Sequence, residues 1–481
     1  MGYFGVLYLN ILFILLDSFS HNSCVGKNKS SVTPNLDALI KRGTYFSQTV
    51  SCAPITVPSI SSMFTAQYPF ESTTLDNNMF NLSLNVPNFV DKLSDVGYGT
   101  YAVLPEGISH TNIPKKFHDG IYYYKSFATL YDGIGDEIVN NLNSKLMKTP
   151  WFYYIELQDL HGHAEFVLSH EPSEFKNEKY GKNQYERMVS MIDIWLGKIT
   201  DCINFDNTII IITADHGSSF AEYTKKLEQY EQHTDKIRAH NPSLAYKSAH
   251  KIITKFPKSL NPLRKRLSEI YTDNKYAHLQ DKLKLELHEI DKLELSPYEK
   301  RLMQNSVVRV PQPFDEHFRI PLLFSGGTIP QNKTIHQQVR SVDIFPTLFE
   351  ILNLPKIEKT RGESLLTIMK DQAADESTAY LDSAALRKES KYKDTIGVRT
   401  SNFKYFRDRS DEKKDIHLFD LHNDPLEENN IYEVRTDMVA EMESQLAKIQ
   451  NNKDFSFKKT KVLTDDEVQK AKDILKTLGY I

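Results

Sequence analysis

Three stretches of the chain are almost continuously apolar. They are NILFILL at 10–16, WFYYIEL at 151–157 and TIIIIT at 208–213. Unbroken apolar runs of this length are typical of parallel strands that are buried on both faces. Helical patterns alternate with these runs, at 33–46, 86–96, 132–146 and 185–202. Strands and helices in alternation predict βαβ units, which build a parallel sheet.

Further patterns extend this scheme along the chain. Residues 98–104 and 314–325 also have the pattern of strands, and residues 342–354 have the pattern of a helix. We therefore expect an α/β fold with a doubly wound, mainly parallel sheet flanked by helices. In such sheets, ligand-binding groups gather at the carboxyl ends of the strands.

The residue pattern along the chain changes in two places. From Ser377 the strand patterns become short, which predicts a small C-terminal α+β subdomain at 377–481 with antiparallel strands and a terminal helix. The catalytic domain is then expected at 1–376. Within it, residues 218–311 are rich in Lys, Glu, His and Tyr and are long for a connection. We interpret them as a solvated helical insertion in preference to a substrate lid.

Composition narrows the class of protein. The chain has 481 residues, 40% hydrophobic and 25% charged, with a formal net charge of −4. These values are those of a globular protein, and the small net charge implies no nucleic-acid partner. Three cysteines are too few for a disulfide framework and suit a reducing compartment.

The apolar N-terminal stretch, residues 2–16, indicates where in the cell the protein is expected. It carries no basic n-region and no evident small-residue cleavage site. It is also short for a membrane span, which needs about 20 apolar residues. We assign its second half to the first strand, and so expect no stable membrane span and a cytoplasmic protein.

The segment 51–69, SCAPITVPSISSMFTAQYP, is a loop that leads into a helix. Pro58 suits the first helical position, and Ile60, Met63 and Phe64 follow at helical spacing. Thr56 therefore lies just outside a helix N-terminus, where unpaired N–H groups and partial positive charge stabilise an anion and ease ionisation of a hydroxyl. The alternative is that Thr56 only caps the helix.

Four polar residues are expected at one edge of the sheet. Asp17 follows the first strand, Asp215 and His216 follow the strand at 208–213, and Thr56 opens its helix. Carboxylate, hydroxyl and imidazole groups together can hold one divalent cation, Ca, Mg, Mn or Zn. A cation on Thr56 would lower its hydroxyl pKa and make it a nucleophile. The alternatives are a turn or capping role for Asp17 and an ordinary loop role for His216.

Other candidates lie on neighbouring loops. His161 can protonate a leaving-group oxygen, and Asp159 with His163 can alternatively hold a second metal. We assign Asn77, His163 and His317 to substrate binding, Asn77 through its amide. The alternative for the histidines is a polar loop at a strand end, and for Asn77 an ordinary turn.

With these residues placed, the chain resembles the sulfatase family of the alkaline-phosphatase-like superfamily over nearly its whole length. The matching motifs are NILFILLD at 10–17, TPNLDALIKRGTYF at 33–46, TADHG at 213–217, FRIPLLF at 318–324, VDIFPTL at 342–348, RGESLL at 361–366, GVRTSNFKYF at 397–406 and LFDLHNDPLEENNI at 418–431. The resemblance implies a doubly wound sheet that carries the metal at its carboxyl edge.

The chain also departs from the family pattern. Family sulfatases carry Cys or Ser, converted to formylglycine, within C/S-x-P-S-R; here Thr56 takes that place and Ile60 that of the arginine. Cys52 offers a C-x-P but lies four residues too early (56 − 52). Ser18 replaces a second aspartate, and VLPEG at 103–107 stands where G-K-W-H is expected.

A threonine in this position is similar to the nucleotide pyrophosphatase/phosphodiesterases and to the phosphoethanolamine and glycerol-phosphate transferases of the same superfamily. The hypothesis is therefore a metal-dependent hydrolase of sulfuric or phosphoric esters, with phosphoesters favoured. The alternatives are a true sulfatase on a sulfated glycan or small sulfate ester, a transferase, and an inactive binding scaffold. The expected partner is an anionic ester, either a glycan or a lipid head group; the sequence does not indicate an oligomeric state.

Overall fold

The computed structural model describes residues 8–24, 29–76, 79–126, 128–144, 146–161, 173–224, 226–227, 286–308, 312–384 and 394–452. The chain divides into two compact units, residues 1–222 with 310–481 and residues 223–309. The second unit falls within the predicted insertion, much of which lies outside the described residues. It contains helix α12 (Pro297–Val308), and residues 286–291 are helical as well. The limits of the predicted domains stay a prediction.

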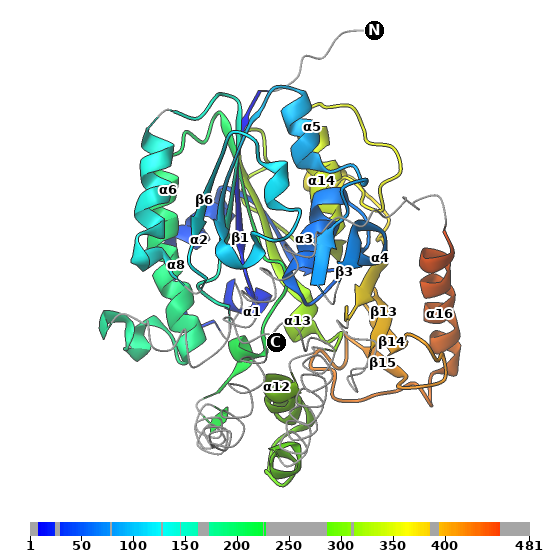
Figure 1. The fold of residues 1–481 in the computed structure, drawn as a ribbon. Helices are drawn as coiled ribbons and strands as arrows, with labels where there is room; N and C mark the ends of the chain where they lie inside the picture. The colour runs from blue at the N-terminus through cyan, green and yellow to red at the C-terminus, as the bar shows by residue number, and fades with distance from the viewer. Residues whose placement is uncertain are drawn as a thin grey trace, which may run out of the picture. The chain divides into compact units, whose positions relative to one another are not determined.

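A nine-stranded sheet forms the centre of the first unit (Figure 1). Its strands are β1 (Asn10–Leu16), β2 (Gly43–Val50), β5 (Gly99–Pro105), β6 (Gly120–Tyr124), β7 (Trp151–Leu157), β8 (Thr208–Thr213), β9 (Arg319–Gly326), β10 (Lys333–Ile335) and β11 (Val339–Arg340). The spatial order is β10-β2-β9-β8-β1-β7-β5-β6, and β11 pairs with β2. Strand β9 runs antiparallel to β8 and β2, while the other neighbours run parallel. The predicted doubly wound, mainly parallel sheet is confirmed.

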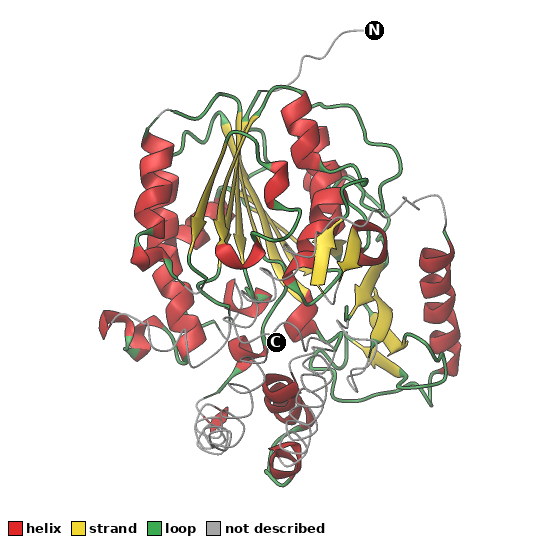
Figure 2. Ribbon diagram, viewed as in Figure 1, coloured by secondary structure: helices red, strands yellow, loops and turns green. Residues whose placement is uncertain are grey.

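Helices cover both faces of this sheet, as Figure 2 shows. The helices are α1 (His21–Cys24), α2 (Pro34–Lys41), α3 (Thr56–Thr65), α4 (Pro69–Ser72), α5 (Phe89–Asp95), α6 (Ile134–Asn143), α8 (Gln184–Asp201), α13 (Asp315–Phe318), α14 (Ile344–Ile351) and α15 (Leu366–Met369). Strand β1 sends alternate side chains to the two faces. Ile11 and Phe13 pack with α3, α5 and α14, whereas Leu12 and Ile14 pack with α2, α6 and α8.

Two smaller sheets complete the first unit. One is the hairpin of β3 (Thr73–Asp76) and β4 (Met79–Leu82), which are antiparallel. The other is the antiparallel sheet of β12 (Ala379–Asp382), β13 (Thr395–Arg399), β14 (Phe403–Asp408) and β15 (His417–Asp420). Helix α16 (Thr436–Asn451) packs on this second sheet through Met442 and Leu446. The expected small C-terminal α+β subdomain is present.

Buried ion pairs connect this subdomain to α13. Arg399 of β13 donates to Asp315 through Nη2, at 2.8 Å, and Lys404 of β14 also pairs with Asp315. The Lys404 ammonium is fully buried and lies 2.7 Å from Oε1 of Glu427.

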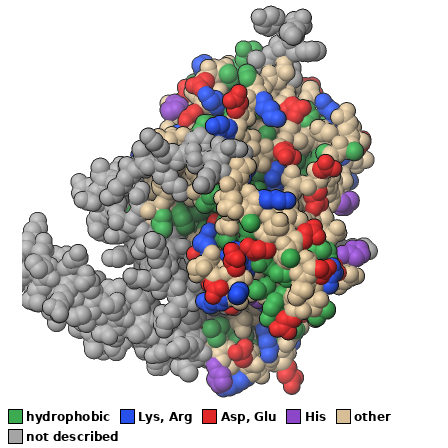
Figure 3. All heavy atoms as spheres, turned by 90° about the vertical axis from the view of Figure 1, so that its right-hand side faces the viewer, with side chains coloured by type: hydrophobic (Ala, Val, Ile, Leu, Met, Phe, Trp, Pro, Cys, Tyr) green, Lys and Arg blue, Asp and Glu red, His purple; other side chains and the backbone are tan. Residues whose placement is uncertain are grey.

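On the face shown in Figure 3, basic and acidic side chains are interspersed. Among the described helices, none combines the length and apolarity that crossing a membrane requires.

Two element boundaries differ from those predicted. The helix expected at 33–46 ends at Lys41, because Gly43 already belongs to β2. A Cβ atom on Gly43 would lie 2.1 Å from the carbonyl oxygen of Phe324, so this glycine permits close strand pairing and does not end the helix. The strand expected at 314–325 begins only at Arg319, after α13. The helix expected at 465–478 lies outside the described residues.

Candidate functional site

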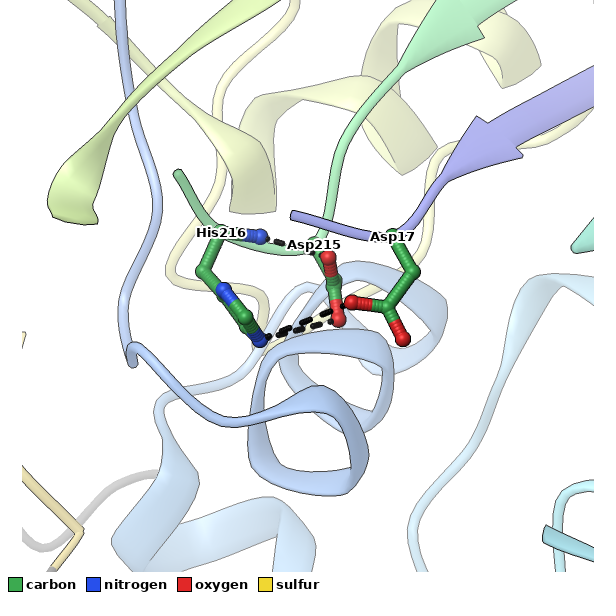
Figure 4. Close-up of side chains that lie close together, drawn as sticks. All are labelled: Asp17, Asp215 and His216. Atoms are coloured by element: carbon green, nitrogen blue, oxygen red, sulfur yellow. Dashed lines mark hydrogen bonds and ion pairs between the residues drawn. The ribbon is translucent and has the colours of Figure 1, made fainter. Parts of the chain in front are cut away.

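The carboxyl ends of β1 and β8 bring two aspartates together. Asp17 follows β1, Asp215 follows β8, and both side chains are fully buried. The two strands are parallel neighbours, so their ends meet at one edge of the sheet. Asp17, Asp215 and His216 each offer a ligand atom, and these atoms all lie within 4.8 Å of one another (Figure 4).

His216 presents one ring nitrogen to the carboxylates. Its Nδ1 donates to the carbonyl oxygen of Gly217 at 2.9 Å, so in the tautomer that could bind a metal the lone pair is on Nε2. Nε2 lies 3.4 Å from Oδ2 of Asp215 and 3.9 Å from Oδ1 of Asp17. A backbone carbonyl on the far nitrogen is a common way to orient a metal-binding histidine.

Gly217 holds this loop against α13. Its N–H donates to the carbonyl oxygen of His317 at 2.8 Å. A Cβ atom on Gly217 would lie 2.3 Å from the carbonyl oxygen of Glu316, so only glycine allows this approach. The glycine of the TADHG motif therefore positions His216. His317 itself is buried in α13, and its assignment to substrate binding stays a prediction.

Ser18 joins the two carboxylates, and the sequence reasoning missed this role. Its N–H donates to Oδ1 of Asp215 at 3.0 Å, and its hydroxyl donates to Oδ1 of Asp17 at 2.9 Å. Its φ of +64° lies in the left-handed region, where a non-glycine residue is disfavoured. Tyr185 helps to hold this conformation by donating its hydroxyl to the Ser18 carbonyl oxygen at 2.7 Å.

The two aspartates have opposite pKa shifts. Burial raises the pKa of Asp17, but the charge and hydrogen bond of His161 outweigh it and lower the value to about 2. Burial, and then the negative charge of Asp17, raise the pKa of Asp215. Two buried carboxylates repel each other, and a divalent cation between them stabilises both in the ionised form. The donor set therefore fits a divalent cation.

Thr56 opens α3 beside this set. Its side chain is partly exposed, and its hydroxyl lies close enough to Asp215 to lower the pKa of that carboxyl. Ile55 takes the N-cap position, so Thr56 is not the cap of this helix. The hydroxyls of Ser51 and Ser59 both donate to the carbonyl oxygen of Asp215, each at 2.6 Å. These bonds tie the loop before α3 to the end of β8, and so place Thr56.

His161 lies on the other side of Asp17. Its Nδ1 is 2.9 Å from Oδ2 of Asp17. Burial works against the protonated ring, but the charge of Asp17 outweighs it and raises the pKa of His161. A protonated imidazole at the edge of the site is a proton donor.

The remaining candidates are placed as follows. Oδ1 of Asp159 accepts a hydrogen bond from the N–H of Leu130 at 3.0 Å, which anchors the 3₁₀ turn at Leu130–Asp132. His163 and Asn77 lie outside the described residues. The second metal site at Asp159 and His163 therefore stays a prediction.

Cys52 and Ile60 face away from this chemistry. Cys52 is buried in the cluster that contains Tyr68 and Tyr380, and Ser341 donates its hydroxyl to Sγ at 3.8 Å. Burial raises the pKa of the Cys52 thiol to about 12, so it stays protonated and unreactive. Ile60 is fully buried in the core on the α3 face of the sheet.

Comparison with known proteins places the chain in a family. The Sulfatase family model matches residues 9–252, and a model described as N-sulphoglucosamine sulphohydrolase, C-terminal, matches residues 294–452. The chain therefore belongs to the sulfatase family, whose members are sulfuric ester hydrolases. The resemblance drawn from the sequence motifs is confirmed.

Two relatives match this chain at low sequence identity. Arylsulfatase K of Rattus norvegicus is 22% identical over 471 residues, which cover 92% of this chain and 78% of the relative. The ulvan-active sulfatase of Formosa agariphila is 26% identical over 237 residues, which cover 44% of this chain and 45% of the relative.

Solved structures share the fold. The i-CgsB complex with k-i-k-neocarrahexaose has a TM-score of 0.58 and 18% identity, covering 97% of this chain and 98% of the other. BT4656 with D-glucosamine-2-N,6-O-disulfate has a TM-score of 0.59 and 14% identity, covering 93% and 98%. The phosphonate monoester hydrolase of Agrobacterium radiobacter has a TM-score of 0.58 and 13% identity, covering 92% and 95%.

Proposed function

We propose that this protein hydrolyses sulfuric or phosphoric esters through attack by Thr56 on the ester's sulfur or phosphorus atom, beside Asp17, Asp215 and His216, which would hold a divalent cation. The observation that carries the proposal is the position of Thr56 at the start of α3, where its side chain lies close enough to Asp215 to lower the pKa of that carboxyl. This position puts a partly exposed hydroxyl at a helix N-terminus and beside the donor set. A divalent cation bound there lowers the pKa of the hydroxyl and draws charge from the ester oxygens.

The residues of the chain then have distinct roles. Thr56 first loses its hydroxyl proton to solvent, and its oxygen then forms a bond to the sulfur or phosphorus atom as the bond to the leaving oxygen breaks. His161, held by Asp17, gives its proton to that leaving oxygen. Unpaired N–H groups at the start of α3 stabilise the charge on the transferred group. In the second step, water attacks the sulfur or phosphorus atom, frees Thr56 and returns a proton to His161; an acceptor alcohol in place of water would make the protein a transferase.

Two substrate classes compete for this site. The threonine itself supports phosphoric esters, because Cys52, the cysteine of the C-x-P segment, is buried away from the site as a protonated thiol. The names of the relatives support sulfated glycans, since one is an ulvan-active sulfatase and two fold neighbours were solved with carrageenan or sulfated glucosamine ligands.

A substrate panel separates these classes. The purified protein is assayed with nitrophenyl sulfate, nitrophenyl phosphate and a bis-nitrophenyl phosphate diester, each with Mn²⁺, Mg²⁺, Ca²⁺ or Zn²⁺. We expect turnover of at least one ester that depends on an added cation and is lost in Thr56→Ala. Turnover of the phosphodiester alone assigns phosphoric esters, and turnover of the sulfate alone assigns a sulfatase. Binding of the cation without turnover of any ester, sulfated oligosaccharides included, would contradict the proposal and favour a binding scaffold.

A further inference from the structure

A third carboxyl group shares the sheet face of Asp17 and Asp215. Glu156 of β7 pairs with Leu15 of β1, and Leu15 pairs with Thr213 of β8. Paired residues of parallel strands point to the same face. Asp17 and Asp215 come two residues after Leu15 and Thr213, so the three carboxyl groups belong to three adjacent strands on one face.

The packing identifies this face as the one beneath α3. Tyr154 precedes Glu156 by two residues and therefore points to the same side of the sheet. The Tyr154 ring packs against Phe64 of α3, with ring centroids 5.2 Å apart. Glu156 thus lies between the sheet and the helix that Thr56 opens, one row below the cation-binding carboxylates.

One oxygen of the Glu156 carboxyl accepts a hydrogen bond, and the other has no partner among the described residues. Its exposed fraction is 0%, and Oε2 accepts a hydrogen bond from the Tyr154 hydroxyl at 3.3 Å. Tyr124 fixes the backbone by donating its hydroxyl to the Glu156 carbonyl oxygen at 2.9 Å. Oε1 has no hydrogen-bond partner among the described residues. A buried carboxyl oxygen without a partner is costly, and such groups call for a missing ligand or a functional role.

The charges that act on Glu156 belong to the carboxylates of the cation site. Burial, and then the charges of Asp17 and Asp215, raise the pKa of Glu156 well above its usual range. A divalent cation in the site would attract the Glu156 carboxylate and so offset these repulsions. Glu156 is not among the residues whose ligand atoms lie within 4.8 Å of one another, so it does not ligate the cation in this arrangement.

We infer that Glu156 is a positioning residue of the cation site, whose carboxyl lies behind Asp17 and Asp215 and strengthens the binding of a divalent cation between them. The inference rests on the cation site of the proposed function. It concerns the affinity of the site and not the chemistry of ester cleavage, so it can be tested without a substrate.

The test is isothermal titration of the full chain with Mn²⁺. We expect Glu156→Gln, which keeps the shape but cannot ionise when a cation binds, to weaken Mn²⁺ binding about tenfold or more, as changes around metal ligands do. Glu186→Gln is the matched control, because Glu186 is also a buried glutamate but binds the N–H of Ser30 at 3.0 Å. The control is expected to keep the wild-type affinity, and the melting temperature of cation-free Glu156→Gln is expected not to fall.

Two results would overturn the inference. If Glu156→Gln binds Mn²⁺ as tightly as the wild type, Glu156 has only a structural role. If the wild type itself binds none of Mn²⁺, Mg²⁺, Ca²⁺ and Zn²⁺, the cation site of the proposed function fails, and the inference with it. Should Glu156→Gln not fold, Tyr154→Phe, which removes only the hydroxyl that orients Glu156, is titrated in its place; weaker Mn²⁺ binding supports the inference and unchanged binding overturns it.

Discussion

The two oxygens of Asp17 face two different histidines: Oδ2 lies 2.9 Å from Nδ1 of His161, and Oδ1 lies 3.9 Å from Nε2 of His216. One carboxylate therefore takes part in the cation site and also orients the proposed proton donor. His161 follows β7, and His216 follows β8. The strand order β8-β1-β7 explains this geometry, because β1 brings Asp17 between the other two strand ends.

The first prediction concerns the leaving group. If His161 protonates the leaving oxygen, His161→Ala should slow the cleavage of an alkyl ester by about 10²–10⁴ in kcat. A nitrophenyl ester needs no such proton, because nitrophenolate is a stable leaving group, so its kcat should fall much less. Steady-state kinetics with an alkyl and a nitrophenyl ester of the same acid measure both. Equal losses for the two esters would remove His161 from the role of general acid.

The second prediction isolates the backbone of Ser18. Both Ser18→Gly and Ser18→Ala remove the hydroxyl that donates to Asp17, but only glycine is at ease at a φ of +64°. Ser18→Gly should therefore be more stable than Ser18→Ala by about 1–2 kcal/mol. Urea unfolding in the presence of a chelator measures the difference. A Ser18→Ala protein at least as stable as Ser18→Gly would show that the left-handed backbone is not strained.

The third prediction is a pH dependence of stability. His21 is buried, with Nδ1 2.7 Å from the Tyr45 hydroxyl and Nε2 3.1 Å from Nη2 of Arg319. Burial, and then the positive charge of Arg319, lower the pKa of His21 from 6.5 to about 3. Between these values the unfolded chain binds a proton that the folded chain does not, so stability falls as the pH falls from 6.5 toward 3.

His21→Gln removes this titration. The free energy of unfolding of the variant should depend less on pH, because the contribution of His21 is gone. That contribution is at most about 1.4 kcal/mol per pH unit. Urea unfolding of both proteins over that pH window measures the slopes. Parallel curves for the wild type and the variant would contradict the lowered pKa of His21.

The fourth prediction concerns the buried ion pairs that connect the C-terminal subdomain to α13. Lys404→Met would leave Asp315 and Glu427 without the ammonium between them. Removing one member of a buried pair costs about 3–5 kcal/mol, because the partner charge stays buried. Lys92→Met is the control, since Lys92 and Asp95 form an exposed pair at 3.2 Å, which contributes about 0–1 kcal/mol. Urea unfolding that finds the two variants equally stable would contradict the assignment of a stabilising buried network.

The large sheet was predicted well where the strands are buried on both faces. For β1, β7 and β8 the apolar runs coincide with the observed strands. Strands that are buried on both faces are almost continuously apolar, so each strand ends where its apolar run ends. Strand β2, GTYFSQTV, was missed because its residues are largely polar. Gly43 also resembles a helix stop, and only the structure shows that it makes room for the Phe324 carbonyl of β9.

The candidate site was predictable in part for a similar reason. Asp17 and Asp215 follow recognisable strands, so their meeting at one edge follows from the parallel sheet. The role of Ser18 was not predictable, because it rests on a backbone conformation and an N–H group that every residue carries. Glu156 did leave a signal, a single acidic residue within an apolar run. That signal is ambiguous until the neighbouring strands are known, since register decides which face the side chain joins.

Thr56, and not Cys52, is the proposed nucleophile. Thr56→Ala should abolish turnover with the fold intact, because loss of a nucleophile costs several powers of ten in rate, about 10⁶ in kcat for a well-studied serine hydrolase. Ile55 occupies the N-cap position, so the variant removes no cap from α3. Cys52→Ala is the matched control on the same loop, and it should keep most of the activity because the thiol only packs against Tyr68 and Tyr380.

The most direct measurement is the turnover of Thr56→Ala and Cys52→Ala, side by side, on the best ester and cation of the panel, with mass spectrometry of the 51–69 peptide. We expect an inactive Thr56→Ala protein, an active Cys52→Ala protein and an unmodified thiol at Cys52. An active Thr56→Ala protein beside an inactive Cys52→Ala protein, with Cys52 lacking its thiol sulfur, would contradict this expectation and identify a formylglycine sulfatase.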